Sequence, residues 1–438
     1  MTSLWTQAAG AAARTPDTRN RYVDFLRAVS ILAVISGHWL MAAPWVSGGG
    51  VRLSNLLEYR SWTHFLTWVF QVMPVFFLVG GYSNGVSWKA AVRDGKSYAD
   101  WLNGRLQRLL GPVMPLLVVW VVLGAAGTAA QVEPVLLRAG SQMALVPIWF
   151  LAVYTMAVVL VPFTYAAWHR FGMWSFWALA LAAVLDDVLF FGADLRLLGW
   201  LNYGFVWLAV HQLGYAWREG WFAGTRRTLV WAATGLLTLV ALVTIGPYPV
   251  SMVSVPGEDV SNTLPPKLPM LLIGVVQSGL LISIEAPMRR WLRRITPWTA
   301  TVLVNGMIMT IFLWHLTAST LLIGGAMVAG DIGLTAVPGS PTWWLLRPVW
   351  LAAYLVALAG LAMIFGRFER DRPGIPPAAP WRQVLGAVFV CGGLAFLALD
   401  GVAGSGALGI RPVALLPFVG AALASVTPFG RTAVGTAA

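Results

Sequence analysis

An arginine and a histidine stand eleven residues apart in FLRAVSILAVISGHWL (residues 25–40), a segment that is otherwise largely apolar. On a helix, eleven steps of about 100° bring Arg27 and His38 to within roughly 20° of each other, about 16 Å apart along the axis. Asp24 lies about one turn before Arg27 and close to the same face. An imidazole suits general-base chemistry near neutral pH, and a guanidinium suits binding of an anion. The segment therefore predicts a helix with one chemically active face.

Each of these residues also has a structural interpretation. Arg27 could extend its charged end to the phospholipid headgroups. A single histidine inside a membrane is often a residue that hydrogen-bonds between helices. Because both side chains share one face with an acid, their arrangement favours a functional polar passage beside the helix.

The composition of the chain places this helix in a membrane. Of the 438 residues, 58% are hydrophobic and 11% are charged, and the mean hydropathy is +0.73. Soluble domains carry about 25% charged residues, so a polytopic membrane protein with the lipid bilayer as its partner is expected. The net charge of +12 is spread over many short loops, which argues against a nucleic-acid partner. The lone Cys391 excludes an internal disulfide, and we expect no metal site.

Windows of about 20 apolar residues predict the membrane spans. We expect a core of ten helices near 23–43, 65–88, 109–128, 147–167, 174–191, 199–217, 228–246, 268–284, 300–326 and 344–366. One or two accessory transmembrane helices, 384–401 and 411–426, are expected to follow.

These spans define an all-α polytopic fold with a cytoplasmic N-terminus. Most of the 29 Lys and Arg residues fall in alternate loops, and the positive-inside rule assigns those loops to the cytoplasm. The expected domains are a cytoplasmic tail (1–21), the ten-helix core (22–370), and a Pro-rich linker with the accessory helices (371–438). The Arg-, Ala- and Gly-rich composition hints at a bacterial source, so we expect the bacterial cytoplasmic membrane.

Further stretches match, in order, the segments of one enzyme family. They are MPVFFLVGGY (73–82), RLQR (105–108), IWFL (148–151) and IFLWHL (311–316). Together with Arg-x10-His and the preceding Asp24, they resemble the membrane acyltransferase-3 family, bacterial integral-membrane enzymes that O-acylate sugars, polysaccharides and some macrolides. The resemblance covers about 22–370. The chain departs from it at Gly80-Gly81, where the family often has Ser-Gly.

The resemblance implies a reaction and a set of participating residues. The donor would be acyl-CoA, with acetyl-CoA as the expected form, and the acceptor would be a hydroxyl of a carbohydrate or secondary metabolite. We expect His38 to be the general base, and Arg27, lower on the same helix face, to belong to the catalytic site as well. The expected donor-binding residues are Arg105, Arg108, Tyr82 and Asp24, because arginine binds phosphate through paired donors. The candidates for supporting this site or binding the acceptor are His315, Trp149 and Asp186.

Other interpretations stay open at this point. A secondary transporter would use Arg27 and His38 as a proton or anion relay, although no internal repeat of the kind found in many transporters is visible. A structural membrane subunit would need neither side chain. Three groups have structural alternatives: Arg105 and Arg108 as cytoplasmic anchors, Gly80-Gly81 as a helix contact, and Asp186-Asp187 as groups that face the outer headgroups.

Overall fold

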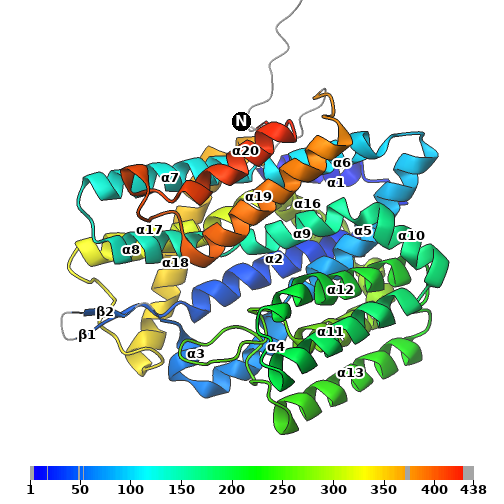
Figure 1. Cartoon of the computed structure of the whole chain (residues 1–438), viewed down its shortest axis with the longest axis horizontal. Helices are drawn as coiled ribbons and strands as arrows, with labels where there is room; N and C mark the ends of the chain where they lie inside the picture. Colours follow the sequence, from blue (N-terminus) through cyan, green and yellow to red (C-terminus); the bar gives the residue numbers. More distant parts are fainter. Residues whose placement is uncertain (1–3, 17, 48–49, 53, 370–374, 428–438) are drawn as a thin grey trace, which may run out of the picture. The chain divides into compact units, whose positions relative to one another are not determined.

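The computed structural model describes residues 4–16, 18–47, 50–52, 54–369 and 375–427. Within these ranges the regular structure is helical apart from two short antiparallel strands, β1 (Trp45–Ser47) and β2 (Gly50–Arg52) (Figure 1). The all-α fold class expected from the sequence is therefore confirmed.

The chain divides into two units. The first consists of Met1–Ala90, Leu160–Ile308 and Gly333–Arg347, and the second of Ala91–Val159, Met309–Ile332 and Pro348–Ala438. The helices that belong wholly or mainly to the first unit are α1 (Leu4–Ala13), α2 (Arg21–Met41), α3 (Leu56–Tyr59), η1 (Ser61–Leu66), α4 (Thr67–Phe70), α5 (Met73–Arg93), α10 (Val161–Phe171), α11 (Trp174–Gly192), η2 (Leu198–Leu201), α12 (Asn202–Arg218), α13 (Thr225–Ile245), α14 (Leu268–Ser283), α15 (Glu285–Trp291) and α16 (Ile295–Asn305). Those of the second unit are α6 (Tyr98–Leu110), α7 (Val113–Ala129), α8 (Pro134–Leu145), α9 (Ile148–Val159), α17 (Ile308–Val328), α18 (Pro341–Phe365), η3 (Gly366–Glu369), α19 (Pro380–Asp400), η4 (Ala407–Gly409), η5 (Pro412–Leu415) and α20 (Leu416–Leu423).

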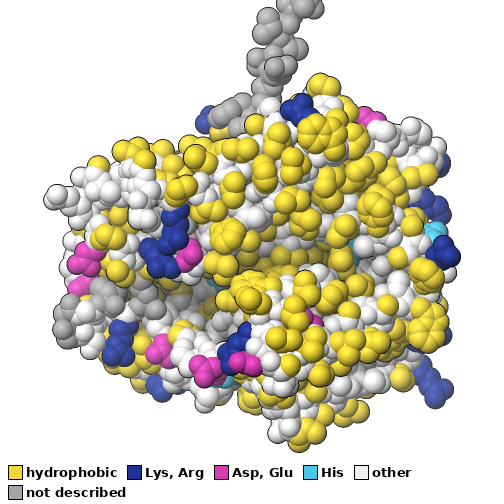
Figure 2. Space-filling view, in the orientation of Figure 1, with side chains coloured by type: hydrophobic (Ala, Val, Ile, Leu, Met, Phe, Trp, Pro, Cys, Tyr) yellow, Lys and Arg dark blue, Asp and Glu magenta, His cyan; other side chains and the backbone are white. Residues whose placement is uncertain are grey.

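Many of these helices are long and apolar enough to cross a bilayer. In the described part of the chain there are eight such segments: Arg21–Met41, Ser61–Arg93, Tyr98–Ala129, Trp174–Gly192, Thr225–Ile245, Ile308–Val328, Pro341–Glu369 and Pro380–Asp400. Two bent pairs, α8 with α9 (44°) and α14 with α15 (53°), bring the number to ten if each pair is one span. Hydrophobic side chains cover much of the face drawn in Figure 2. The protein is therefore a multi-pass membrane protein.

The stretch 147–167, expected as one helix, is interrupted. Helix α9 ends at Val159 and α10 begins at Val161. Pro162, in the first turn of α10, lacks an N–H, and its ring would clash with the carbonyl of Val158 in a continuous helix. Hydropathy alone does not register this break.

The stretch 300–326 is also two helices, because α16 ends at Asn305 and α17 begins at Ile308. The start of α17 is capped from a distant part of the second unit. Glu369 accepts hydrogen bonds from the backbone N–H groups of Met309 and Thr310, both at 2.9 Å, and from the Thr310 hydroxyl at 2.7 Å. This carboxylate satisfies N–H groups that lack a partner within the helix.

The two ends of the chain differ in part from the expected domains. Residues 4–13, expected as tail, form α1, which packs against α16. Within the second unit, α19 is the expected accessory helix, and it packs against α9 and α20. The expected span 411–426 contains only the apolar helical stretch Pro412–Leu423, which is shorter than the roughly 20 residues that a span needs. Of the Pro-rich linker, residues 370–374 lie outside the described part.

Candidate active site

Helix α2, which carries Arg27 and His38, is fixed at its N-terminal end by a side-chain cap. The side-chain oxygen of Asn20, Oδ1, accepts a hydrogen bond from the Tyr22 N–H at 3.1 Å. A cap of this kind stabilises a helix by about 1 kcal/mol. The Asn20 amide group donates to the Tyr82 hydroxyl of α5 at 3.2 Å and to Glu285 of α15 at 3.0 Å. The cap therefore also joins α2 to two neighbouring helices.

The C-terminal end of α2 is held by a buried cation. Arg347, which is 6% exposed, donates to the carbonyl oxygens of Trp39 at 3.2 Å and Ala42 at 2.9 Å. Its guanidinium lies 3.8 Å above the Trp343 ring. A positive charge at this end is favourable for the helix dipole and occupies carbonyls without a partner within the helix.

Between these anchors, α2 presents Arg27 and His38 on one face. The helix runs without interruption from Arg21 to Met41, so the eleven-residue spacing aligns the two side chains. Val29 and Leu32 are exposed at 43% and 46%, and they project from roughly the opposite face. Both ionisable side chains therefore avoid the apolar exposed stripe.

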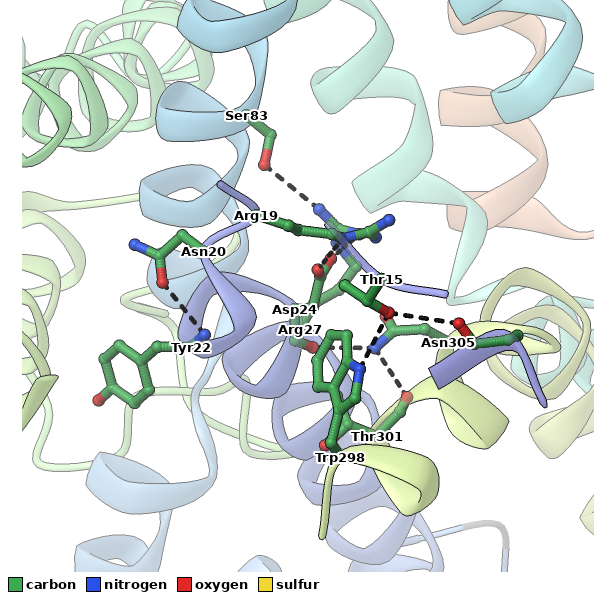
Figure 3. Close-up of polar contacts among 11 residues, drawn as sticks. Thr15, Arg19, Asn20, Tyr22, Asp24, Arg27, Ser83, Trp298, Thr301 and Asn305 are labelled. Atoms are coloured by element: carbon green, nitrogen blue, oxygen red, sulfur yellow. Dashed lines mark hydrogen bonds and ion pairs between the residues drawn. The ribbon is translucent and has the colours of Figure 1, made fainter. Parts of the chain in front are cut away.

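A carboxylate lies between two guanidinium groups at the start of α2 (Figure 3). Asp24 accepts from Arg19 Nε on one oxygen at 2.6 Å and from Arg27 Nη1 on the other at 3.3 Å. The Asp24 side chain is buried, and its backbone carbonyl accepts from Asn305 Nδ2 at 2.9 Å. The hydrogen bond to Asp24 raises the pKa of Arg19, which keeps that guanidinium charged.

Arg27 also reaches α5, where its Nη2 donates to the Ser83 hydroxyl at 3.3 Å. The preceding residue, Tyr82, packs on Trp217 with ring centroids 4.8 Å apart. The structure thus pairs Arg27 with Asp24 and places Arg27 against Ser83, the residue after Tyr82. Asp24, Arg27 and Tyr82 are all residues expected from the sequence.

The glycines before Tyr82 serve a helix contact. The backbone of Gly81 meets that of His211 and Gly214 on α12 with no room for a side chain. Beside this contact, the Asn84 amide donates to His211 Nε2 at 3.1 Å, and both side chains are buried. The packing alternative for Gly80-Gly81 is therefore confirmed at Gly81.

A groove of about 320 Å³ opens in the first unit next to the α2 cap. Its lining includes Phe222, Thr225, Ser283, Glu285 and Arg289. Glu285 connects the groove to the cap because it accepts the hydrogen bond from Asn20.

Asp186 and Asp187, near the end of α11, lie inside the first unit. They are 4% and 2% exposed, so the interpretation that they face the outer headgroups is wrong. Asp187 accepts hydrogen bonds from Asn202 and Tyr248, both at 2.9 Å, and from the Leu268 N–H at 2.8 Å. Within the described residues, Asp186 Oδ2 has no hydrogen-bond partner.

A buried lysine completes this group. Lys267 Nζ lies 4.0 Å from an Asp187 oxygen and 3.6 Å from the centroid of the Phe190 ring. The Lys267 side chain is fully buried, and its burial lowers the pKa of the ammonium. Asp187 is therefore the counter-charge for Lys267.

The loop between α13 and α14, residues 246–267, is attached along its length. Trp68 and Gln71, in and just after α4, donate to two of its backbone carbonyls at 2.8 and 3.1 Å. Inside the loop, the Asn262 amide donates to two further carbonyls at 2.7 and 2.9 Å. The loop thus forms a fixed part of the first unit.

In the second unit, α6 carries Arg105 and Arg108. The helix starts with a reciprocal cap in which Ser97 and Asp100 each bind the other's backbone N–H at 3.2 Å. The Arg105 guanidinium lies 5.6 Å from the centroid of the Trp101 ring, one turn earlier, while Arg108 is exposed. The pair is thus presented on a well-formed helix.

His315 and Trp149 also belong to the second unit. The His315 side chain is fully buried on α17, and its Nδ1 lies 2.6 Å from the Phe312 carbonyl. Because a carbonyl only accepts, Nδ1 carries the proton, and Nε2 is the basic nitrogen of the neutral ring. Phe312 packs against Phe150, next to Trp149, with ring centroids 5.7 Å apart.

Comparison with known proteins decides the family. A family model described as an acyltransferase domain, that of the acyltransferase-3 family, matches residues 20–367. The chain belongs to the acyltransferase-3 family. No curated protein and no solved structure matches it. The match begins at the α2 cap and ends close to Glu369, so this membrane acyltransferase uses both units for its family domain.

Several residues that hold α2 and Arg27 in place were not expected from the sequence. Asn20 before an apolar helix is a recognisable cap signal. Arg347, Ser83 and Asn305 gave no such signal, because they act on α2 from far along the chain.

Proposed function

We propose that this acyltransferase moves an acyl group from acyl-CoA, most simply acetyl-CoA, to a hydroxyl of a carbohydrate or secondary metabolite. The observation that carries the proposal is the placement of Arg27 and His38 on one face of α2, away from its exposed apolar stripe. Caps at both ends of the helix keep that face in position.

His38 acts as the general base in this proposal. Its imidazole takes the proton from the acceptor hydroxyl as the oxygen attacks the thioester carbonyl. The new C–O bond forms, the C–S bond breaks, and the imidazolium returns the proton to the departing thiolate. No net proton is left on the enzyme, so one histidine suffices for a full turnover.

The remaining residues serve binding in the same proposal. Arg27 and Tyr82 bind the donor with Asp24 holding Arg27 in place, and Arg105 and Arg108 are the proposed phosphate-binding residues. Asp186, which has an unused carboxylate oxygen within the described structure, is a candidate to bind the acceptor. His315 and Trp149 are candidates to support the site. The positive-inside pattern supports an N-terminus in the cytoplasm, and the Arg-, Ala- and Gly-rich composition supports a bacterial cytoplasmic membrane.

The direct test is acyl transfer by the purified chain in nanodiscs supplied with labelled acetyl-CoA. Wild type is expected to transfer the label or to hydrolyse the thioester slowly, and His38→Ala should abolish both. His169→Gln is the matched control, because His169 is exposed and pairs with Glu219, the residue just after α12. Full acylation by His38→Ala would refute the proposed base, and loss of a solute flux instead would favour a transporter.

The acceptor can be identified in a deletion strain. Its surface glycans and secreted metabolites are compared with those of the parent by mass spectrometry. One component is expected to lack an ester, and that component names the acceptor. Identical ester patterns in both strains would contradict O-acylation of these classes.

A further inference from the structure

The start of α2 holds two guanidinium groups on one carboxylate. Arg19 Nε binds one oxygen of Asp24 at 2.6 Å, and Arg27 Nη1 binds the other at 3.3 Å. Since the two oxygens belong to one group, the guanidiniums are held next to each other (Figure 3). We call Arg19, Asp24 and Arg27 the Asp24 clamp.

The clamp has a net positive charge, and Arg19 has hydrogen-bond donors that its contact with Asp24 does not use. Two guanidiniums and one carboxylate leave a net charge of one. The Arg19 side chain is 55% exposed, whereas Asp24 is nearly buried. Arg19 contacts Asp24 through Nε, so this contact leaves its two terminal amino groups, with four N–H donors, unused.

Such a pair matches one class of ligand. A guanidinium presents paired donors that fit the oxygens of a phosphate; Arg19 offers such a set, and the adjacent Arg27 adds its positive charge beside it. A carboxylate at this position weakens a merely electrostatic attraction, but it fixes both donors in space. The arrangement therefore suits a phosphate that binds in a defined orientation.

We infer that Arg19 and Arg27, held by Asp24, bind a phosphate of the acyl donor. The inference rests on the proposed function, which supplies acyl-CoA as the donor. In it, Arg19 is a binding residue that the motifs do not mark, and Asp24 is a positioning residue. Lipid headgroups carry the same phosphate chemistry, so the test must separate the two sources.

Binding is measured by calorimetry on the full chain in a non-ionic detergent free of phospholipid, with CoA, 3′-dephospho-CoA and acetyl-pantetheine as probes. Arg19→Gln should weaken CoA binding about tenfold, the loss expected for one charge-assisted hydrogen bond. Acetyl-pantetheine, which carries no phosphate, should bind unchanged. The matched control is Arg93→Gln, since Arg93 also binds an aspartate through Nε, at 2.9 Å.

Asp24→Asn distinguishes two explanations of CoA binding: arginines that Asp24 holds in a fixed orientation, and a general electrostatic attraction of CoA to positive charge. The variant makes the region more positive, so simple attraction predicts tighter CoA binding. The clamp predicts weaker binding, because the guanidiniums lose their common charged acceptor. Asp94→Asn is the matched control, and a melting curve shows whether each variant is folded.

The outcomes are distinct. If Arg19→Gln weakens the binding of dephospho-CoA as strongly as that of CoA, the clamp binds the diphosphate. If it leaves the binding of dephospho-CoA unchanged, the clamp binds the 3′-phosphate. Both results support the inference. Unchanged CoA binding by Arg19→Gln, or equal weakening of acetyl-pantetheine, overturns it and leaves Arg19 as a headgroup anchor. In that case wild type still transfers the acyl group. A wild type that neither binds CoA nor transfers an acyl group refutes the proposed function itself.

Discussion

A Cβ atom placed on Gly81 of α5 would lie 2.0 Å from the carbonyl oxygen of His211 on α12. The contact is reciprocal, because a Cβ on Gly214 would lie 2.2 Å from the carbonyl oxygen of Leu78. Backbone meets backbone here, and no rotation of a side chain can relieve an added methyl group. At these two glycines the backbones of α5 and α12 are therefore in direct contact.

Gly81→Ala should destabilise the protein by about 1–3 kcal/mol, because it overpacks a contact that cannot yield. The measurement is thermal unfolding in detergent, followed by loss of the monodisperse peak in size-exclusion chromatography. Gly204→Ala on α12 is the control, since no atom lies within 4 Å of its added Cβ. Equal melting temperatures for wild type and Gly81→Ala would refute the close contact.

Asp187→Ala should cost about 3–5 kcal/mol, because it leaves the buried Lys267 without a counter-charge. Adding Lys267→Met to this variant should recover a large part of the loss, since the uncompensated ammonium is then gone. Unfolding curves of the two single variants and the double variant give the coupling. As a control, Asp194→Asn should change little, because Asp194 is exposed and asparagine tolerates its positive φ of 53°. Additive single effects would show that the two charges are not coupled.

Glu369→Ala should lower the free energy of unfolding by about 1–2 kcal/mol, because the first turn of α17 loses its acceptor. Glu369→Gln should be milder, since its one remaining carbonyl oxygen still accepts. Hydrogen exchange at Met309 and Thr310 gives a local measure. Unaltered protection of these two amides in Glu369→Ala would contradict the cap.

Arg105→Gln and Arg108→Gln should each raise the KM for acyl-CoA about tenfold and change kcat little, if these arginines bind donor phosphate. Steady-state transfer assays over a range of acetyl-CoA concentrations provide both constants. Arg170→Gln, on α10, is the control for loss of a basic residue. A normal KM in both variants would leave the pair as cytoplasmic anchors.

The orientation can be tested by single cysteines. The native Cys391 is buried, so an added cysteine dominates labelling. With the N-terminus inside, Asp194→Cys should react with an impermeant maleimide in intact cells, and Asp94→Cys only after permeabilisation. The opposite pattern would reverse the topology.

The period and length of apolar segments predicted the fold class and the face shared by Arg27 and His38. These features are local, and a helix repeats them regularly. The stretches 147–167 and 300–326 were each wrongly predicted as one helix, and each break has a physical reason. Pro162 could have been recognised as a break from the sequence, whereas the cap at α17 depends on Glu369, about sixty residues away.

The candidate site was predictable to a similar extent. Asp24 and Arg27 are close in sequence, so their ion pair follows from helical spacing. Arg19 precedes the helix, and its approach to Asp24 depends on the turn at Asn20. Ser83 could not be predicted as a partner of Arg27, because only the packing of α5 on α2 brings them together.

The attachment of residues 246–267 limits how far this segment can move. A flap opens on a few hinges, but this segment would have to break its bonds to Trp68 of α4 and to Asp187 of α11 before it could swing. For the same reason it is a poor place to insert an epitope tag, because a graft there would disturb its contacts with two helices at once.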